Sequence, residues 1–258
     1  MMGNKILTNL KMSELLLEYR HAEHRLILLD YDGTLVKIQN NPSDVIPSLE
    51  VVEIVRRIAS EEKNTVAIIT GRDSEYISQW FGNMNVYLFT EHGAYSKEPT
   101  KTEWVSLVSG NQVWKSEILT ILEKYKSKVH GVIIEERASS ISWHYRNVSF
   151  DDAYIVTEDL LNCLNNYITE EMNILVVHKK RVVEIRKNEC NKGTASEKMI
   201  QLKNFEFILS VGDDITDENM FNALPSYAYS FKVGSGITKA KMNLENQKEV
   251  IELLKKLS

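Results

Sequence analysis

The sequence predicts an α/β protein in which a doubly wound parallel sheet carries an inserted α+β domain. Short apolar runs alternate with amphipathic helical patterns at both ends of the chain. Between residues 97 and 183 the order changes to helix–strand–strand, and this unit occurs twice. The strands of each pair there are joined by short connections, which requires antiparallel pairing because parallel strands need a long crossover. We therefore expect a core domain of residues 1–96 and 184–258, interrupted by an inserted domain of residues 97–183.

The first part of the chain begins with an amphipathic helix and continues as strands alternating with helices. Residues 26–29 form an unbroken apolar run, as expected of a strand covered on both faces. Pro42 and Pro47 indicate a loop after it, and Ser48 and Asp73 are suitable caps for the next two helices. The elements expected here are helices over 13–24, 48–61 and from 73, and strands over 26–29, 65–70 and 86–90.

The remaining elements follow from the same patterns. In the inserted domain we expect helices over 111–126 and 151–168 and strands over 131–137, 140–146, 173–178 and 181–186. After it the parallel pattern resumes, with helices over 193–203 and 244–257 and strands over 205–212 and 227–233.

Composition limits the classes of partner and compartment. A net charge of −5 over 258 residues argues against nucleic-acid binding, which needs a basic face. No apolar run approaches the length of a membrane span, and the first residues lack the apolar core of a signal peptide. Two distant cysteines, Cys163 and Cys190, fit a reducing compartment and give no zinc site. We expect a cytoplasmic monomer with a small-molecule substrate and no membrane partner.

Acidic and other polar side chains follow several of the predicted parallel strands. Carboxylates stand at Asp30 and Asp32, and four more acids follow Gly212. The carboxyl ends of parallel strands share one edge, so these groups can meet in one crevice. Carboxylates crowded together need a cation, and an all-oxygen set favours Mg²⁺. The candidate residues at these ends and before the next helix are Asp30, Asp32, Thr70, Arg72, Lys192, Asp213, Asp214, Asp217 and Glu218.

The string RLILLDYDGTL over residues 25–35 resembles the DxDGT signature of the haloacid dehalogenase (HAD) superfamily of aspartate-nucleophile phosphatases. The resemblance implies a HAD-like core. It implies that Asp30 attacks phosphorus, and that Asp32 protonates the leaving group and then deprotonates the attacking water. Mg²⁺ would bind Asp30, the Asp32 carbonyl and Asp213. Thr70 and Lys192 would hold the phosphoryl oxygens. Asp214 and Asp217 would hold metal-bound water or orient Lys192.

Further strings resemble the trehalose-6-phosphate phosphatase family of that superfamily. EERASSISWHYR over 135–146 resembles its ExKxxSxxWHYR-type stretch, and VVEIRKNECNKG over 182–193 resembles its VEIRPxxxNKG stretch. EHGAY and GDDITDENMF also fit. The resemblance implies that residues 97–183 form a cap domain for sugar recognition. The resemblance implies Mg²⁺-dependent hydrolysis of trehalose 6-phosphate, through an aspartyl-phosphate, to trehalose and phosphate. It implies that substrate-binding residues are Gly71, Arg72, His92, Glu135, Arg137, Arg146, Glu184 and Asn191.

Side-chain alternation supports the cap contacts. Glu135 and Arg137 differ by two positions, so a strand places both on one face, where they can bind sugar hydroxyls. Two positions depart from the family pattern. Arg137 stands where the family has Lys, and these two cations differ in geometry. Lys187 stands where the family has Pro.

Three alternatives stay open at this point. The chain could be another sugar-phosphate phosphatase of the superfamily, such as a sucrose-phosphate-like enzyme. It could be a phosphohexomutase with a similar cap, which returns the phosphoryl group to a sugar. It could also be a non-catalytic regulatory domain, although the combined presence of Asp30, Asp32, Lys192 and Asp213 argues against that.

Overall fold

The chain divides into two units of different architecture, seen in a computed structural model that describes residues 8–39, 45–108, 113–137, 139–179 and 181–258. The first unit comprises Met1–Leu107 with Asn191–Ser258, and the second comprises Val108–Cys190. The sequence placed these boundaries at 96–97 and 183–184. The predicted α/β class, with a mostly parallel sheet and a separate antiparallel sheet, is confirmed. Pro42 and the start of the helix expected from residue 111 lie outside the described residues.

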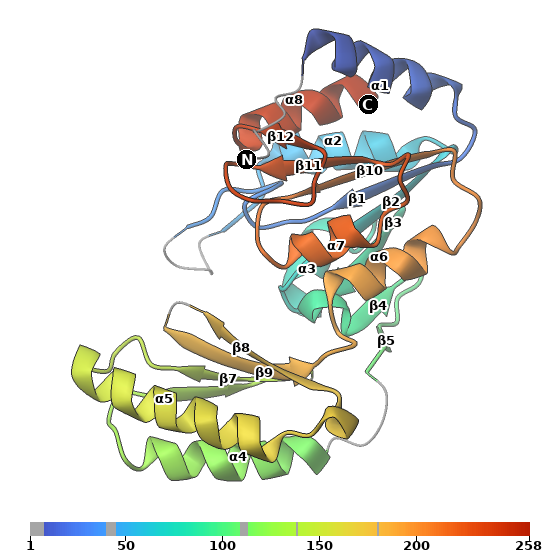
Figure 1. The fold of residues 1–258 in the computed structure, drawn as a ribbon. Coiled ribbons are helices and arrows are strands. Elements are labelled where there is room, and N and C mark those ends of the chain that lie inside the picture. Colours follow the sequence, from blue (N-terminus) through green and yellow to red (C-terminus); the bar gives the residue numbers. More distant parts are fainter. Residues whose placement is uncertain (1–7, 40–44, 109–112, 138, 180) are drawn as a thin grey trace. The chain divides into compact units, whose positions relative to one another are not determined.

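An eight-stranded sheet forms the first unit, in the order β12-β11-β10-β1-β2-β3-β4-β5 (Figure 1). The parallel strands are β1 (Arg25–Leu29), β2 (Asn64–Ile69), β3 (Val86–Thr90), β10 (Phe207–Gly212), β11 (Tyr229–Val233) and β12 (Met242–Leu244). Two short antiparallel strands, β4 (Tyr95–Lys97) and β5 (Val105–Ser106), complete one edge. Strands β4, β5 and β12 were not predicted from the sequence, because strands of two or three residues carry too little pattern to be recognised.

Strand β1 lies at the centre of this sheet. All five of its residues are buried, as its apolar run predicts. It pairs in parallel with β10 on one side and β2 on the other, so that Leu29 lies beside Val211 and Ile68. The loops after β1, β2 and β10 therefore leave the sheet at one edge, where ligands bind in open α/β sheets.

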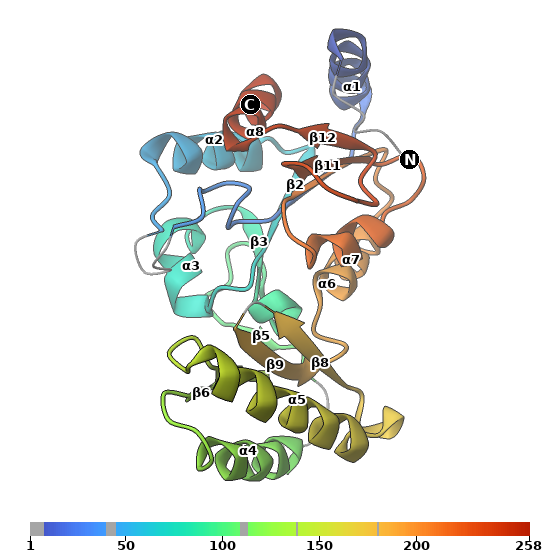
Figure 2. The ribbon, with the colours of Figure 1, turned by 60° about the vertical axis from the view of Figure 1, so that its left-hand side comes forward.

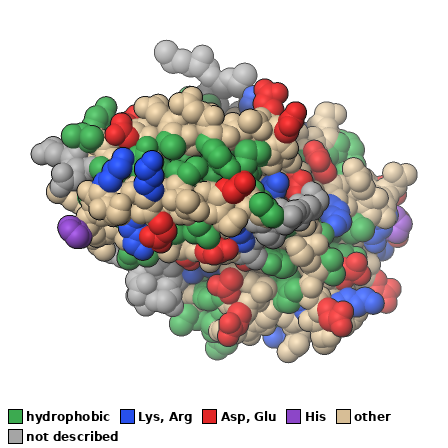
Figure 3. All heavy atoms as spheres, turned by 90° about the horizontal axis from the view of Figure 1, so that it is seen from below, with side chains coloured by type: hydrophobic (Ala, Val, Ile, Leu, Met, Phe, Trp, Pro, Cys, Tyr) green, Lys and Arg blue, Asp and Glu red, His purple; other side chains and the backbone are tan. Residues whose placement is uncertain are grey.

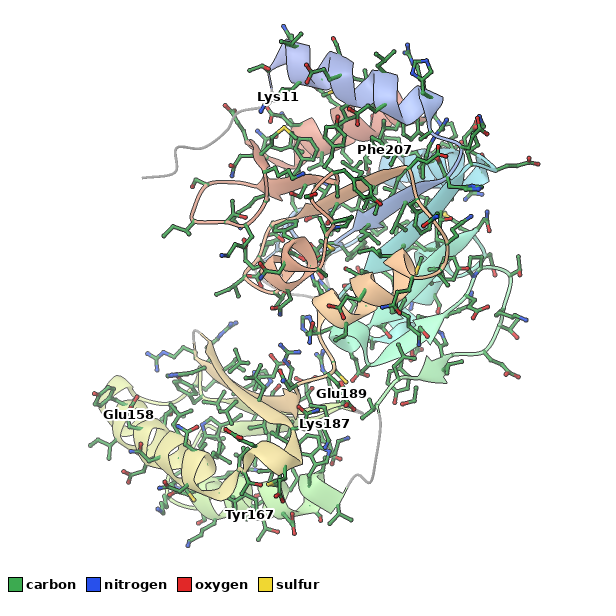
Figure 4. All side chains as sticks on the ribbon, turned by 45° about the vertical axis from the view of Figure 1, so that its right-hand side comes forward. Lys11, Glu158, Tyr167, Lys187, Glu189 and Phe207 are labelled. Carbon is green, nitrogen blue, oxygen red and sulfur yellow. The ribbon has the colours of Figure 1, made fainter. Side chains whose placement is uncertain are left out.

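Helices cover both faces of the sheet (Figures 1 and 2). One face packs against α1 (Asn9–His21), α2 (Leu49–Ser60), α3 (Ser74–Phe81) and α8 (Gln247–Leu257). The other packs against α6 (Lys192–Ile200) and α7 (Asp217–Asn222). Side-chain alternation on β1 supplies both cores, since Ile27 belongs to the first and Leu28 to the second. Under α1, the ring of Phe207 stacks on Tyr229 and meets the edge of Tyr19 (Figure 4).

The second unit is a four-stranded antiparallel sheet in the order β6-β7-β9-β8. Its strands are β6 (Ile133–Glu136), β7 (Ser140–His144), β8 (Ile174–Lys179) and β9 (Val182–Lys187), and its helices are α4 (Val113–Lys126) and α5 (Phe150–Tyr167). Both helices pack on one face of the sheet, over Trp143 and Ile185 (Figure 1). The opposite face carries polar side chains, as period-two alternation requires.

Two short 3₁₀ segments, Glu91–Gly93 after β3 and Glu170–Met172 after α5, complete the described elements. Near the second, the Nζ of Lys187 donates to the Met172 carbonyl oxygen at 2.9 Å (Figure 4). The lysine that departs from the expected proline therefore ties the end of β9 to the start of β8. On the face in Figure 3, acidic and basic side chains are interspersed, in keeping with 31 basic and 36 acidic residues in the chain.

Candidate active site

A buried lysine joins two buried carboxylates where β1, α6 and α7 meet. The Nζ of Lys192, the first residue of α6, donates to Oδ1 of Asp30 at 2.5 Å and to Oδ1 of Asp217 at 2.7 Å. The three side chains are 3%, 4% and 0% exposed. Charges that are this deeply buried need partners, so Lys192 and the two aspartates depend on one another.

Burial and neighbouring charges shift the pKa values of Lys192, Asp30 and Asp213. Desolvation acts to lower the pKa of Lys192, but the charges of Asp30 and Asp217 outweigh it and the pKa is raised. Desolvation and the neighbouring Asp217 raise the pKa of Asp30 well above its usual range. The same two causes raise the pKa of Asp213 to about 6. An additional positive charge would therefore stabilise the ionised form of both acids.

Two glycines allow the acids to come together. A Cβ at Gly33, whose φ is +84°, would lie 2.0 Å from Oδ2 of Asp213. A Cβ at Gly212 would lie 2.4 Å from Cγ of Asp217. Oδ2 of Asp217 accepts hydrogen bonds from the backbone N–H groups of Asp213 and Asp214, both at 2.9 Å. Asp217 therefore shapes the turn after β10 and orients Lys192.

The arrangement of the acids suits a hard divalent cation. Asp30, Asp213 and Asp217 each offer an oxygen atom, and these atoms lie within 4.8 Å of one another. Oδ2 of Asp30 and Oδ1 of Asp213 are buried and accept no hydrogen bond from the described residues. Unsatisfied buried carboxylate oxygens beside raised pKa values fit a bound Mg²⁺, which prefers oxygen ligands.

The end of β2 supplies a second set of polar groups. Thr70 is buried, and its Oγ1 accepts a hydrogen bond from the backbone N–H of Arg72 at 3.1 Å. The guanidinium of Arg72 donates to both oxygens of Asp32, from Nε at 2.8 Å and from Nη2 at 2.5 Å. These hydrogen bonds raise the pKa of Arg72. The structure thus brings together two residues that the sequence analysis assigned to different roles.

The segment after β3 has an unusual backbone. Glu91 and His92 have φ values of +48° and +58°, and Gly93 follows at +107°. Positive φ is uncommon for side-chain-bearing residues and often marks functional segments. The segment is held to β2, since the backbone N–H of His92 donates to the Thr70 carbonyl. A Cβ at Gly71 would lie 2.7 Å from the His92 ring, so these two predicted substrate-binding residues are in close contact.

Asn191 starts the helix that carries Lys192. Its side-chain oxygen accepts hydrogen bonds from the backbone N–H groups of Gly193 and Thr194, at 2.9 and 3.1 Å. The Thr194 side chain bonds back to the Asn191 backbone, which completes a capping box. This cap fixes the first turn of α6 and therefore the backbone from which Lys192 extends.

The predicted sugar-binding residues lie in the second unit. Glu135 and Glu184 flank Ser142 in one cross-strand row. Oε1 of Glu135 accepts from Nε of Arg137 at 2.9 Å, and Oε2 lies 2.9 Å from Nε2 of His144. Partial burial acts to raise the pKa of Glu135, but these hydrogen bonds outweigh it and lower the pKa. This polar face thus presents acceptor and donor groups side by side.

Two predicted residues are placed differently from the rest. Strand β7 ends at His144, so Arg146 lies in the exposed turn after it and the expected strand over 140–146 was too long. Asp214 is exposed, and its Oδ1 accepts from the backbone N–H of Ile215.

Lys232 also belongs to the site, although it was not predicted from the sequence. Its Nζ, at the end of β11, donates to the Asp213 carbonyl at 2.5 Å. Only the expectation that β11 ends at the same edge as β10 could have drawn attention to it.

Among the described residues, no helix is both long and apolar enough to cross a membrane.

Known proteins of one family are similar to this chain. A family model described as trehalose-phosphatase matches residues 28–257. A bifunctional trehalose-6-phosphate synthase/phosphatase of Thermoproteus tenax is 33% identical over 253 residues, which are 98% of this chain and 34% of that protein. A trehalose-phosphatase of Schizosaccharomyces pombe is 30% identical over 80% of this chain and 26% of that protein. The chain thus spans between about a quarter and a third of the length of these relatives.

A solved structure is similar over nearly the whole chain. The C-terminal domain of trehalose-6-phosphate phosphatase from Candida albicans gives a TM-score of 0.83 at 31% identity, and the match covers 99% of this chain and 98% of that domain. Both units described above therefore have counterparts in one known domain.

Proposed function

The chain belongs to the trehalose-phosphatase family, and we propose that it hydrolyses trehalose 6-phosphate to trehalose and inorganic phosphate. One observation carries the proposal. Asp30, Lys192 and Asp217 form a buried charged cluster with Asp213 beside it, at the sheet edge where α/β proteins bind ligands. Burying such a cluster is costly, and a substrate phosphoryl group with its metal ion gives a reason for keeping it.

In the proposed reaction Asp30 is the nucleophile. Its carboxylate oxygen attacks phosphorus, the bond from phosphorus to the sugar oxygen breaks, and Asp32 gives a proton to that oxygen. Water then attacks the aspartyl-phosphate, and Asp32 takes a proton from it. Asp30 is suited to its part because Lys192 fixes one carboxylate oxygen and leaves Oδ2 without a hydrogen bond from the described residues.

The phosphoryl oxygens need donors and positive charge. Lys192 supplies charge from the first turn of α6, and Thr70 supplies a hydroxyl from the end of β2. Asp30, Asp213 and the Asp32 carbonyl would hold Mg²⁺, and Asp217 keeps the turn and Lys192 in place. When bound, Mg²⁺ offsets the negative charge that collects on the phosphoryl group and the surrounding acids.

Sugar recognition is assigned to the polar face of the second unit. Glu135 and Glu184 offer carboxylates to sugar hydroxyls, and Arg137 offers a cation beside Glu135. Arg146, in the turn after β7, supplies a further cation. In the first unit, Gly71 follows Thr70 and Asn191 precedes Lys192 in the sequence, and the backbone N–H of His92 donates to the Thr70 carbonyl. These three residues are proposed to contact the substrate. Asp214 is exposed, and its proposed role is to hold metal-bound water.

A substrate panel tests the proposal. Phosphate release is measured from trehalose 6-phosphate, sucrose 6-phosphate, glucose 6-phosphate and 4-nitrophenyl phosphate, with and without Mg²⁺. We expect the highest kcat/KM for trehalose 6-phosphate and no turnover after chelation. Equal or faster release from the other sugar phosphates would refute the substrate assignment, and transfer to a sugar without phosphate release would indicate a mutase.

The nucleophile is tested by Asp30→Asn, which keeps the size of the side chain and removes its charge. Turnover should be abolished while the far-ultraviolet circular dichroism spectrum is unchanged. Retained turnover in this variant would remove Asp30 from its role.

A further inference from the structure

Arg72 is bound to the residue that would exchange protons with the leaving group and with water. Its guanidinium places two N–H donors on the two oxygens of Asp32, at 2.8 and 2.5 Å. The Asp32 side chain is one third exposed, at 33%, so packing alone leaves it several rotamers. A bidentate fork selects one of them, because both carboxylate oxygens are then fixed in one plane.

Arg72 is itself fixed from several directions. Its backbone N–H donates to Oγ1 of Thr70 at 3.1 Å, and its carbonyl accepts from the backbone N–H of Glu91 at 3.0 Å. Its guanidinium lies 4.7 Å from the centre of the Tyr76 ring, an arrangement that favours a cation. The Arg72 side chain is 15% exposed, so little of it is left to water. Asp32 is therefore connected to the ends of β2 and β3 and to helix α3.

We infer that Arg72 is a positioning residue that holds the Asp32 side chain in one orientation for the hydrolysis of the phosphorylated enzyme. The inference rests on the proposed function and reassigns Arg72 from substrate binding. In that step a water oxygen bonds to phosphorus and a water proton passes to Asp32. The bond between phosphorus and the Asp30 oxygen breaks, and its electron pair returns to the Asp30 carboxylate. Only a correctly aimed Asp32 can accept the proton, and a guanidinium fork fixes the direction of both of its oxygens.

An aryl phosphate separates this step from the one before it. The 4-nitrophenolate group leaves without a proton, so formation of the phosphoenzyme from 4-nitrophenyl phosphate depends little on Asp32. Hydrolysis of the phosphoenzyme still depends on it. Damage to the position of Asp32 should therefore appear as a slow second step and an accumulated intermediate, which loss of a substrate contact does not produce.

The experiment compares Arg72→Gln, Arg72→Lys and Asp32→Asn in the full chain with Mg²⁺. For Arg72→Gln we expect kcat for 4-nitrophenyl phosphate to fall about 10²-fold, which is the lower end of the rate effects of general bases. A burst of 4-nitrophenolate and a mass increase of one phosphoryl group on acid-quenched protein should accompany it, as in Asp32→Asn. Arg72→Lys keeps the charge but loses the fork, and should lie between Arg72→Gln and the unaltered chain. Arg57→Gln, on an exposed helix position, is the matched control and should show neither effect.

The outcomes separate the inference from the proposed function. A raised KM without phosphoenzyme accumulation in Arg72→Gln would overturn the inference and indicate a substrate contact. If Arg72→Gln does not fold, Arg72→Lys and Tyr76→Leu take its place. Tyr76→Leu removes the ring beneath the guanidinium and should also accumulate phosphoenzyme. If neither Arg72→Lys nor Tyr76→Leu accumulates phosphoenzyme, the inference is overturned. An unaltered chain that consumes none of the phosphates would overturn the proposed function and this inference together.

Discussion

Replacing Gly33 with alanine should abolish the binding of Mg²⁺, and Gly234 provides a matched control. Both glycines have left-handed backbones, with φ of +84° and +82°. Alanine costs about 1–2 kcal/mol in this conformation at either site. A Cβ at Gly234 meets nothing within 4 Å, but at Gly33 it would lie 2.0 Å from Oδ2 of Asp213. Asp213 would have to move by roughly 1 Å, whereas metal-ligand distances tolerate only about 0.2 Å.

Thermal unfolding with and without Mg²⁺ measures this difference. At about 100 times its dissociation constant, a ligand stabilises the native state by about 2.7 kcal/mol. In a chain of this size that corresponds to roughly 5–11 °C. Gly234→Ala should start from a lower Tm than the unaltered chain and keep the full increment on adding Mg²⁺. Gly33→Ala should lose both the increment and Mg²⁺-dependent phosphate release. Equal increments in the two variants would refute the placement of Asp213 in the metal site.

Three further predictions concern charge. Lys192→Met leaves two buried carboxylates unpaired and should cost about 3–5 kcal/mol of unfolding free energy, as measured by denaturant titration. The control is Lys63→Met, which breaks an exposed pair with Glu23 and should cost at most about 1 kcal/mol. Similar losses in the two variants would contradict the importance of burial for the Lys192 pair. Because the pKa of Asp213 is raised to about 6, its protonated form stabilises the folded metal-free protein, and this part of the unfolding free energy should be lost as pH rises from about 4 through 6. For the same reason, the Mg²⁺ affinity measured by calorimetry should be weaker at pH 5 than at pH 7.5. An unchanged affinity would argue against Asp213 as a ligand. Glu135→Gln should raise KM for trehalose 6-phosphate several-fold and leave that for 4-nitrophenyl phosphate unchanged, whereas equal effects on both would remove Glu135 from sugar recognition.

The strongest sequence signals were those in which pattern and chemistry coincided. The apolar run before Asp30 predicted a central buried strand, and the structure places all of β1 in the interior. Asp30, Lys192 and Asp213 were expected to converge because the carboxyl ends of parallel strands lie at one edge of the sheet. That expectation requires a doubly wound sheet and no knowledge of the exact strand register. Helix starts at Ser48 and Asp73 were also confirmed, because a capping side chain is a local signal.

Contacts between distant side chains could not be predicted in the same way. The sequence gives no sign that Arg72 reaches Asp32 or that Lys232 reaches the Asp213 carbonyl, since each depends on strand register and on rotamers. The helix over Asp217–Asn222 was hidden because its acids were read as site residues and its single apolar pair is too short for a period. The end of β7 was placed too late for a similar reason, because Tyr145 continues the apolar alternation beyond the last paired residue, His144.

The order of the strands has a consequence for biosynthesis. Lys192 and Asp30 are separated by 162 positions, and β1 borders on β10, which the ribosome completes only after the whole inserted unit. During translation β1 therefore has a neighbour on one side only, and its other side waits with unpaired amide and carbonyl groups. Such distant pairing slows folding and leaves the nascent chain prone to association. It also means that a truncated polypeptide ending before residue 190 would carry Asp30 without its buried cation, and we expect it to be inert.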